Sequence, residues 1–592
     1  MLSGAPHRGP DGDDAWLHGG VALAHQYFAV DAGARRPHFP AIDEAGRIAV
    51  TFDGRLDNCD DLAERLNVAG ERIESVLLAA YSRWGTECAQ HLAGDFAVVF
   101  WDDERRQLFF ARDRLGVRDL CYSVTPDRVL VASEVDHILG HPAFRSPSPD
   151  ERKVAMTLAN CWVDHEHSFI DGIRFCPPGA CGTVDRNGAV RITRYWQADL
   201  HRRLTYRDDR QYAEHFGELF RRALARRLPN NGRVGVSLSG GPDSAAVAAT
   251  SASLVPRDRL RSYSYVFERF PTCDERAFID RIVSHLDLDA TYLAGDDHGP
   301  LIQQGDRIVY PGFGTQDPYI GLVRTIYRAA SEDGCRVLVT GHSADHLFSG
   351  GDFWAGEMAA SGRLMTLAVT VLRHRENLTL GYPFRSNPIA QVLPMRLRRA
   401  LAGRATRGVQ PWIAGGFART TDLDSALALE AGRWDTRLDG RPRRLQHLIN
   451  AAESQGMSAA RRHFNGLGIE VVDPFFDTDL VEMALAVPAD QLGRPHLSKW
   501  MLRQSLRGKV PERCRLRAGK TSLFELFADA LAVRARSFVD ELLTSPQVVE
   551  RGWIDPAWLA TELQRSPAEW TLSGLPLWQC VTLEMWLREC WP

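Results

Sequence analysis

The sequence of 592 residues contains no apolar run that approaches the roughly twenty residues needed to cross a bilayer, and its first residues lack the apolar core of a signal peptide. Its 11 cysteines include no Cys-x-x-Cys pair, which argues against a structural zinc site and fits a reducing compartment. The formal net charge is only −4, so composition gives no support for nucleic-acid binding. These absences favour a cytoplasmic protein that binds neither a membrane nor nucleic acid.

A chain of this length exceeds one hydrophobic core, so two or more domains are expected. In the first 200 residues, short alternating segments such as 47–54, 95–102 and 128–134 are separated by Gly, Asp or Asn turns, which is typical of β-strands. Helical spacing interrupts them at 58–66 and 71–85. We therefore expect a β-rich N-terminal domain.

The pattern changes after about residue 205. A helical segment over 208–228 precedes a strand that begins at Arg233, and further strands are predicted over 259–267 and 335–341, with a helix over 274–286. Strands that alternate with helices imply a parallel sheet whose ligands lie at the carboxyl ends of the strands. From about residue 355 the pattern is mainly helical.

The first of these strand–helix units contains the segment VSLSGGPDS. Its paired glycines let main-chain N–H groups approach a phosphate closely, and its serine hydroxyls can donate hydrogen bonds. The residues are Ser239, Gly240, Gly241 and Ser244. Asp243 would repel phosphate unless a cation lay between them, which suggests Mg²⁺. A tight turn that merely caps a helix is the alternative.

This segment resembles the ATP loop of the asparagine synthetase family, and similar landmarks follow one another in the family's order along nearly the whole chain. They are HRGPDG (7–12), GDFAVVFWD (94–102), ARDRLGVRDL (111–120), VASE (131–134), PPG (177–179), YW (195–196), TGHSADHLFSGG (340–351), DPFFD (473–477), KWMLR (499–503) and RLRAGK (515–520). The resemblance implies an α/β protein with two domains. Residues 1–203 would form a degenerate class II glutamine amidotransferase-like sandwich, and residues 204–592 an adenylating domain of the PP-loop ATPase type with a helical extension.

The resemblance also implies ATP and Mg²⁺ as the bound nucleotide and metal, and the formation of an acyl-adenylate that an amine converts to an amide. The nucleotide would contact Leu238, Ser239, Gly240, Gly241, Asp243, Ser244, Val266, Thr340 and Gly341. Asp243 and Asp345 would hold Mg²⁺. Lys520 would neutralise charge that develops on the phosphates or on the tetrahedral intermediate.

Departures from the family concern glutamine. The glutamine-using members carry a nucleophilic cysteine directly after the initiator methionine, whereas this chain begins Met1-Leu2-Ser3. The family's Asn-Gly-Glu element reads Asp53-Gly54-Arg55, which reverses a charge, and Tyr27 aligns with the arginine expected to hold the glutamine carboxylate. We expect no glutaminase activity, and the first domain would serve as a scaffold.

A second departure lies in TGHSADH, where His342 and His346 replace two glutamates of asparagine synthetases. Imidazole titrates near neutral pH and suits the removal of a proton from an amine, which free ammonia needs less than a peptide amine does. His342 is therefore a candidate base. The alternative is a polar residue that the backbone satisfies at a strand end, and His346 is equally compatible with a contact at a helix start.

The segments FDGRLDNCDDLAERL (52–66) and FERFPTCDER (267–276) resemble the lasso peptide cyclases, which join an internal Asp or Glu side chain of a precursor peptide to its own α-amine. Such pathways include a leader peptidase and a leader-binding protein as partners. A glutamine-independent asparagine synthetase, a β-lactam synthetase-like ligase and a non-enzymatic paralogue remain open. Arginine-rich segments at 394–408 and 433–448 fit either solvated helix faces or binding of an acidic ligand.

Overall fold

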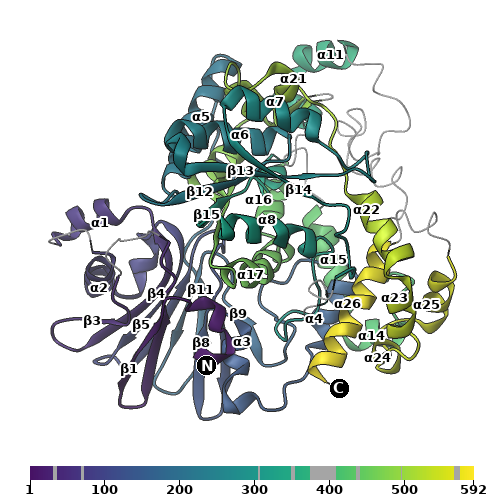
Figure 1. The fold of residues 1–592 in the computed structure, drawn as a ribbon. Helices are drawn as coiled ribbons and strands as arrows, with labels where there is room; N and C mark the ends of the chain where they lie inside the picture. Colours follow the sequence, from purple (N-terminus) through teal and green to yellow (C-terminus); the bar gives the residue numbers. More distant parts are fainter. Residues whose placement is uncertain are drawn as a thin grey trace.

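The computed structural model describes residues 1–30, 37–68, 72–303, 307, 309–348, 354–373, 408–434, 440–494, 497–565 and 574–591. It has the expected mixed α/β fold, with a β-rich N-terminal part and a C-terminal part built on a parallel sheet (Figure 1). The predicted boundary between residues 203 and 204 stays a prediction. It lies in the segment between Arg194, where the last N-terminal strand ends, and Asp209, where the next helix begins.

The N-terminal part is a sandwich of antiparallel strands. Its larger sheet contains, in spatial order, β11 (Val190–Arg194), β10 (Ala180–Val184), β6 (Gln107–Arg112), β5 (Gly94–Asp102), β4 (Ile48–Leu56) and β3 (Ala41–Ile42). The facing layer consists of β8 (Arg128–Ala132), β7 (Cys121–Thr125) and β9 (Ile173–Phe175), together with the hairpin of β1 (Asp13–His18) and β2 (Val21–Gln26). Buried apolar side chains from both layers meet in one cluster. Helices α1 (Cys59–Leu66) and α2 (Ile73–Trp84) cover the opposite face of the larger sheet.

The C-terminal part is organised around a five-stranded parallel sheet. Its strands are, in spatial order, β14 (Asp289–Ala294), β13 (Leu260–Val266), β12 (Arg233–Ser237), β15 (Cys335–Val339) and β16 (Glu470–Val472). One face packs against α5 (Asp209–Ala225), α6 (Pro242–Leu254) and α7 (Arg276–Leu286). The other face packs against α8 (Ile320–Glu332) and α17 (Ala451–Asn465). The strand order brings the ends of β12, β13 and β15 together in the middle of the sheet.

The remainder of the described chain is helical. A first group comprises α9 (Ala344–Leu347), α10 (Trp354–Ala360), α11 (Leu364–Arg373), α16 (Arg441–Leu448), α18 (Thr478–Ala486), α19 (Ala489–Leu492), α20 (Trp500–Ser505) and α21 (Glu512–Arg515), with the short hairpin β17 (Gly493–Arg494) and β18 (Leu497–Ser498). The others are α14 (Gly415–Thr420), α15 (Leu423–Trp434), α22 (Phe524–Asp529), α23 (Arg536–Leu542), α24 (Gln547–Glu550), α25 (Pro556–Leu563) and α26 (Gly574–Cys590). No helix in the described ranges is both long and apolar enough to cross a membrane.

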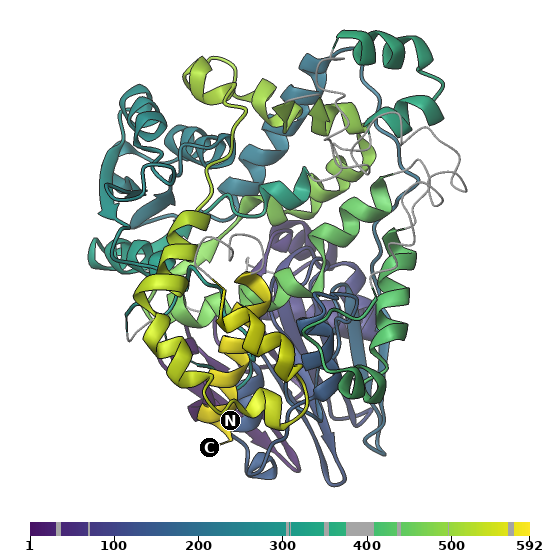
Figure 2. The ribbon, with the colours of Figure 1, turned by 90° about the vertical axis from the view of Figure 1, so that its right-hand side faces the viewer.

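This second group of helices packs on the N-terminal part. Figures 1 and 2 show α26 and its neighbours, coloured yellow, beside α4 (Glu151–Leu158), and α3 (Val135–Leu139) lies on the same side of the sandwich. A single hydrophobic cluster joins apolar residues from both parts, and the ring of Phe169 meets that of Trp586 edge-on at 5.7 Å. The two parts therefore share a core.

Buried ion pairs also cross between the two parts. Arg461 on α17 donates to Asp119 at 3.1 Å, and both side chains are almost completely buried. Arg118 pairs with Glu470 on β16 at 2.7 Å. Because a buried charge is costly without its partner, these pairs fix how the sandwich sits against the parallel sheet.

The strands and helices predicted from the sequence are confirmed, each with ends shifted by a few residues. The segment at 95–102 lies within β5, 259–267 contains β13, 335–341 contains β15 and 274–286 contains α7. Strands β14 and β16 were not predicted. Strand β14 is a half-exposed edge strand with polar positions, and β16 has only three residues, so neither carries a strong alternating pattern.

Candidate functional site

The predicted phosphate loop connects the end of β12 to the start of α6. Gly240 has a φ of 71°, in the left-handed region that glycine adopts without strain, and a Cβ there would meet Cβ of Phe278 at 2.9 Å. The Leu238 N–H donates to the Tyr263 carbonyl at 2.9 Å, which continues the ladder between β12 and β13. Glycine is thus required for the turn and for the close approach of α7.

The two serine hydroxyls of this loop bond to each other. Ser239 Oγ and Ser244 Oγ lie 3.2 Å apart, the Ser239 N–H donates to Ser244 Oγ at 3.1 Å, and Ser244 is buried. Ser244 therefore braces the turn, whereas Ser239 is exposed. Among the described residues, no side chain caps the N-terminus of α6, so its first main-chain N–H groups face outward beneath the loop. These donors and the helix dipole suit an anion.

The neighbouring strand supplies the other side of the site. The Thr340 N–H donates to the Val472 carbonyl at 2.9 Å, so Thr340 continues β15 beside β16. A Cβ on Gly341 would lie 3.1 Å from the carbonyl carbon of Asp243, which explains a glycine at this crossing. Val266 ends β13. The structure thus brings Leu238, Val266, Thr340 and Gly341 to one edge of the sheet, and their contact with a nucleotide stays a prediction.

Two predicted acidic residues converge on one lysine. Lys499 Nζ lies 2.6 Å from Asp345 Oδ1 and also pairs with Asp243 Oδ2. Lys499 has a φ of 61°, uncommon outside glycine, and its side chain is only 8% exposed. Lys520 Nζ approaches the other Asp345 oxygen at 2.6 Å, but this side chain is 81% exposed. The site thus holds one buried cation and one cation that is free to reorient.

The two carboxyl groups differ electrostatically. Burial raises the pKa of Asp243, although Lys499 opposes the rise. Burial also acts against ionisation of Asp345, but Lys499 and Lys520 outweigh it and lower the pKa of Asp345 to about 2. Asp345 is therefore ionised throughout the neutral range, and the charge of Asp243 depends on a neighbouring cation.

The donors present fit Mg²⁺. Asp243 Oδ1 is buried and has no hydrogen-bond partner within the described residues, which leaves an acceptor available for a cation. No group of three or more His, Cys, Asp or Glu that could hold a metal occurs within those residues. Two carboxylates completed by phosphate oxygens and water form the kind of site that Mg²⁺ occupies with a nucleotide.

His342 directly follows Gly341 at the end of β15. Its side chain is exposed, and its ring centroid lies 6.5 Å from that of His346. The adjacent Ser343 N–H donates to Asp473 Oδ2 at 2.7 Å, which anchors the turn and leaves the His342 ring facing solvent. An exposed ring at the strand end is available to a substrate, and the role of His342 as a base stays a prediction.

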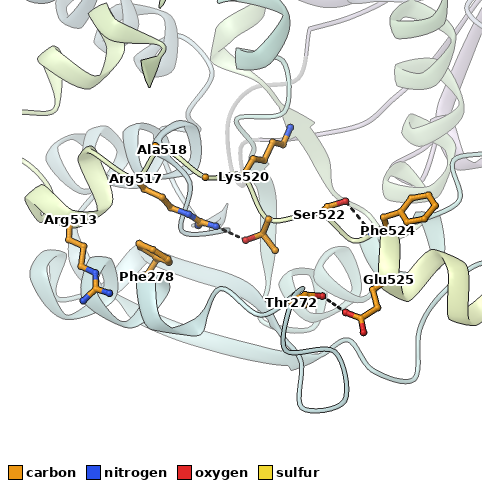
Figure 3. A pocket seen from close by; sticks show the side chains of 11 residues that line it. Thr272, Phe278, Arg513, Arg517, Ala518, Lys520, Ser522, Phe524 and Glu525 are labelled. Carbon is orange, nitrogen blue, oxygen red and sulfur yellow. Dashed lines mark hydrogen bonds between the residues drawn. The ribbon is translucent and has the colours of Figure 1, made fainter. Parts of the chain in front are cut away.

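An open groove of about 710 Å³ adjoins the site (Figure 3). Phe278, whose Cβ approaches Gly240, forms part of its wall, and Lys520 lies at its edge. Arg517 stacks on Phe278 with its guanidinium carbon 4.2 Å from the ring centroid, and it pairs with Glu275 at 2.6 Å. Figure 3 shows the Lys520 side chain directed away from Arg517 and Phe278.

Arg55 and Tyr27 stand where glutamine-using relatives are expected to bind glutamine. In this structure both side chains contact other residues of the chain. Arg55 pairs with Asp57 at 2.5 Å and with Asp95 at 3.0 Å. Burial opposes its charge, but these carboxylates raise the pKa of Arg55 further. The Tyr27 hydroxyl donates to the Phe39 carbonyl at 2.6 Å. Neither side chain is arranged to receive an amino acid.

Two arginines of the second arginine-rich segment differ from both expectations, and the first segment is almost wholly undescribed. Residues 394–407 lie outside the described residues. In the second segment, Arg441 and Arg444 are buried, and they donate to carbonyls at the end of α18, Arg441 to Leu485 at 2.8 Å and Arg444 to Ala484 at 3.3 Å. These two arginines satisfy a helix C-terminus, and they neither face solvent nor await a ligand.

Sequence reasoning did not assign a role to Lys499. The motif KWMLR begins with Lys499 and resembles a landmark of the family, but Lys499 is more than 250 residues from Asp243 along the chain. The left-handed conformation at the start of α20 directs its side chain between the two carboxylates. A signal was present in the motif, whereas the partners depended on the tertiary fold.

Comparisons with known proteins agree with this organisation. Residues 1–196 match the glutamine amidotransferase domain and residues 215–588 match the asparagine synthase family. The chain is similar to asparagine synthetase (glutamine-hydrolyzing) 3 of Bacillus subtilis, with 30% identity over 44% of each chain. It is 26% identical to amidase chry2 of Gibberella zeae over 58% of this chain and 54% of that one.

A longer match is to asparagine synthetase (glutamine-hydrolyzing) 2 of Bacillus subtilis, with 24% identity over 86% of this chain and 66% of the relative. The chain spans about half the length of the first two relatives. The family match covers both the phosphate loop and Lys520.

Proposed function

The chain belongs to the asparagine synthase family, and we propose that it is an ATP-dependent, AMP-forming amide ligase. The observation that carries the proposal is the meeting of Asp243, Asp345 and Lys499 at the carboxyl ends of parallel strands, beside the uncapped start of α6. This arrangement supplies main-chain donors for phosphate, two carboxylates for a cation and a buried positive charge.

In the first step, an oxygen of the substrate carboxylate attacks the α-phosphorus of ATP. The bond from that phosphorus to the oxygen bridging to the β-phosphate breaks, and pyrophosphate leaves with the electron pair. Mg²⁺, held by Asp243 and Asp345, would neutralise charge on the phosphates. Lys499 and Lys520, which pair with these two carboxylates, would add positive charge near the leaving group, where pre-organised charge is most effective.

In the second step, an amine attacks the acyl carbon of the adenylate, and the bond from that carbon to the AMP oxygen breaks. The nitrogen must lose a proton, and a ring nitrogen of His342 is the acceptor that we propose. Its exposed position at the end of β15, three residues before Asp345, supports this role. His342 would then release the proton to solvent.

We propose a leader-cleaved peptide as the substrate, whose Asp or Glu side chain is adenylated and whose own α-amine closes a macrolactam ring. The contacts of Arg55 and Tyr27 support a nitrogen source other than glutamine. The segments FDGRLDNCDDLAERL and FERFPTCDER resemble the lasso peptide cyclases. Holding both ends of one peptide can reach effective molarities of about 10⁵ M or more, so positioning would supply much of the rate. A leader peptidase and a leader-binding protein are the proposed partners.

Mass spectrometry tests the proposal. The purified protein is incubated with Mg-ATP and the precursor peptide encoded beside its gene, with the leader peptidase present. A parallel reaction contains aspartate and ammonium, with glutamine as a further control. Loss of one water from the peptide together with release of AMP is the expected result. Asparagine as the only amide product would overturn the peptide substrate, and absence of AMP in every reaction would overturn the ligase.

A further inference from the structure

The open groove beside the phosphate loop is in contact with the site at two places. Its wall residue Phe278 packs against Gly240, and its edge residue Lys520 pairs with Asp345. Of the predicted site residues, Lys520 alone lines the groove within the described ranges. The groove is therefore next to the nucleotide residues and separate from them, as a site for the second substrate should be.

The dimensions of the groove exceed those of a free amino acid. A volume of about 710 Å³ falls within the range of sites for ligands of several hundred daltons. One long side of the groove is formed by residues 518–522, which belong to no helix or strand. Five extended residues span about 17 Å. A short stretch of peptide matches both the volume and the length.

Residues 518–522 also present unused main-chain donors. Within the described residues, none of their N–H groups donates a hydrogen bond, and four of the five residues are exposed. A peptide in an extended conformation can bond to such a strip through its own backbone, which gives affinity without demanding a particular sequence. A free amino acid could use only a small part of it.

The side chains along the groove offer contacts for a peptide's side chains. Phe278 under Arg517, and Phe524 at the opposite end, are apolar surfaces. Arg513 is exposed and takes part in no ion pair among the described residues. At the end near Phe524, the Thr272 hydroxyl donates to Glu525, which joins the loop after β13 to α22. The groove thus offers two apolar surfaces and one positive charge, and the bond between Thr272 and Glu525 closes one end.

We infer that this groove binds the substrate peptide in an extended conformation along residues 518–522, so that its reacting carboxylate reaches Lys520. The inference rests on the proposed function, because it assumes a peptide substrate. Main-chain bonding along the strip sets the direction of the peptide, and Phe278, Phe524 and Arg513 select its side chains.

Gly519 provides a test that leaves the site residues in place. A Cβ at Gly519 would meet nothing within 4 Å, and its φ lies outside the left-handed region, so a larger side chain is accommodated and enters open space beside the strip. In Gly519→Trp, the KM for the leader-free peptide should rise about tenfold or more, while the KM for ATP changes less than about twofold. Gly519→Gln should give a smaller rise in the same direction and is the variant used if the tryptophan prevents folding.

Gly416→Trp is the matched control, because Gly416 is exposed on α14, is equally open and lines no part of the groove. It should leave both KM values unchanged. Calorimetric titration of the peptide into wild type and Gly519→Trp measures binding without turnover, so the inference is tested even if no ring forms. Peptide affinity equal to that of wild type in Gly519→Trp, or a rise confined to the KM for ATP, would overturn it.

Discussion

Asp243 is subject to two opposing influences at the scale of a single residue. Burial raises the pKa of its carboxyl group, and contact with Lys499 favours the ionised form. A second carboxylate, Asp345, adds repulsion. The charge on Asp243 is therefore maintained by the cation beside it, and a divalent cation would maintain it more strongly than a lysine does.

Replacing Asp243 by asparagine separates this electrostatic role from folding. We expect Asp243→Asn to abolish ATP–pyrophosphate exchange, because an amide is a weaker metal ligand and carries no charge. The melting temperature should stay within about 3 °C of wild type, because Lys499 keeps its pair with Asp345 and the shape is kept. Asp61→Asn, on the exposed first turn of α1, is the control. Exchange at a near wild-type rate in Asp243→Asn contradicts the metal role.

His342 should act in only one of the two half-reactions. In His342→Gln we expect ATP–pyrophosphate exchange to persist, because adenylation needs no base at the amine, while amide formation falls about 100-fold. His346→Gln, which removes the neighbouring imidazole, is the control and should leave both half-reactions unchanged. Equal losses in both half-reactions would show that His342 is structural.

Some residues of the site can be predicted from the sequence, and the roles of others cannot. Asp243, Asp345 and Lys520 belong to local motifs, and the structure brings them together. The role of Lys499 depends on a left-handed turn, and that of Ser244 on a hydroxyl that folds back into the loop. Such directions are set by tertiary packing, which a local motif does not encode.

At the scale of elements, helix α3 begins with a reciprocal cap that requires a neutral imidazole. The Glu134 carboxylate accepts the His137 main-chain N–H, and His137 Nδ1 accepts the Glu134 N–H at 3.3 Å. The other ring nitrogen, Nε2, lies 2.8 Å from Gln26 Oε1. Burial lowers the pKa of His137 to about 4, although Glu134 opposes this. Protonation of Nδ1 would remove the acceptor from the cap.

Acid should therefore weaken the protein through its buried histidines, although burial raises the pKa of Asp113 to about 6, which acts in the opposite direction. Burial also lowers the pKa of His25 to about 4 and that of His463 to about 3. Since the unfolded pKa of histidine is about 6.5, the unfolded chain binds more protons between pH 6.5 and 4. Stability is thus full above pH 6.5 and is lost as the pH falls towards 4. His167 acts in the opposite direction, because a hydrogen bond to Asp164 raises its pKa.

Urea denaturation at pH 7.5 and pH 5 measures this effect, and the midpoint should be lower at pH 5. His137→Gln keeps a donor and an acceptor without a titrating ring, so it should reduce the difference between the two midpoints. Equal urea midpoints at pH 7.5 and pH 5 in wild type would contradict the prediction. It would also be contradicted if the midpoint of His137→Gln changed between the two pH values as much as that of wild type.

Helices and strands were predicted correctly where the apolar residues recur with a strong period. The environment of a residue was not predicted where a segment distant in the sequence buries it. Helix α5 has a clear apolar stripe and was expected from 208–228. By its sequence, the segment 433–448 fits either a solvated face or an acidic-ligand site, but Arg441 and Arg444 are buried by α18, which lies more than 30 residues further along the chain. Charged residues whose partners are distant in sequence give no local sign of burial.

At the scale of the whole molecule, the two parts are joined by a common core and by buried charges. Apolar residues of α4 and β9 pack with those of α26 in one cluster. Arg461 and Asp119 form a buried pair across the boundary. Removing either part would expose apolar surface and leave buried charges without partners, each of which is costly.

Neither residues 1–203 nor residues 204–592 should therefore fold as a stable monomer alone. We expect each fragment to aggregate when produced separately, because the shared cluster becomes solvent-exposed. Production of both fragments together should give a soluble complex. Soluble yield and size-exclusion chromatography provide the measurement, with the full chain as control. A monodisperse, cooperatively unfolding fragment of either kind would contradict the shared core.

Three tryptophans bind across this boundary through their indole nitrogens. Trp412 Nε1 donates to the Leu158 carbonyl at 2.8 Å, and Trp591 Nε1 donates to the Pro147 carbonyl at 2.6 Å. Trp553 Nε1 donates to the Glu151 carboxylate at 3.4 Å. Indole emission responds to water and to hydrogen bonding, so separation of the two parts would shift the fluorescence spectrum to longer wavelength. The protein consequently carries its own optical reporter of domain contact, which requires no dye and can be followed during catalysis.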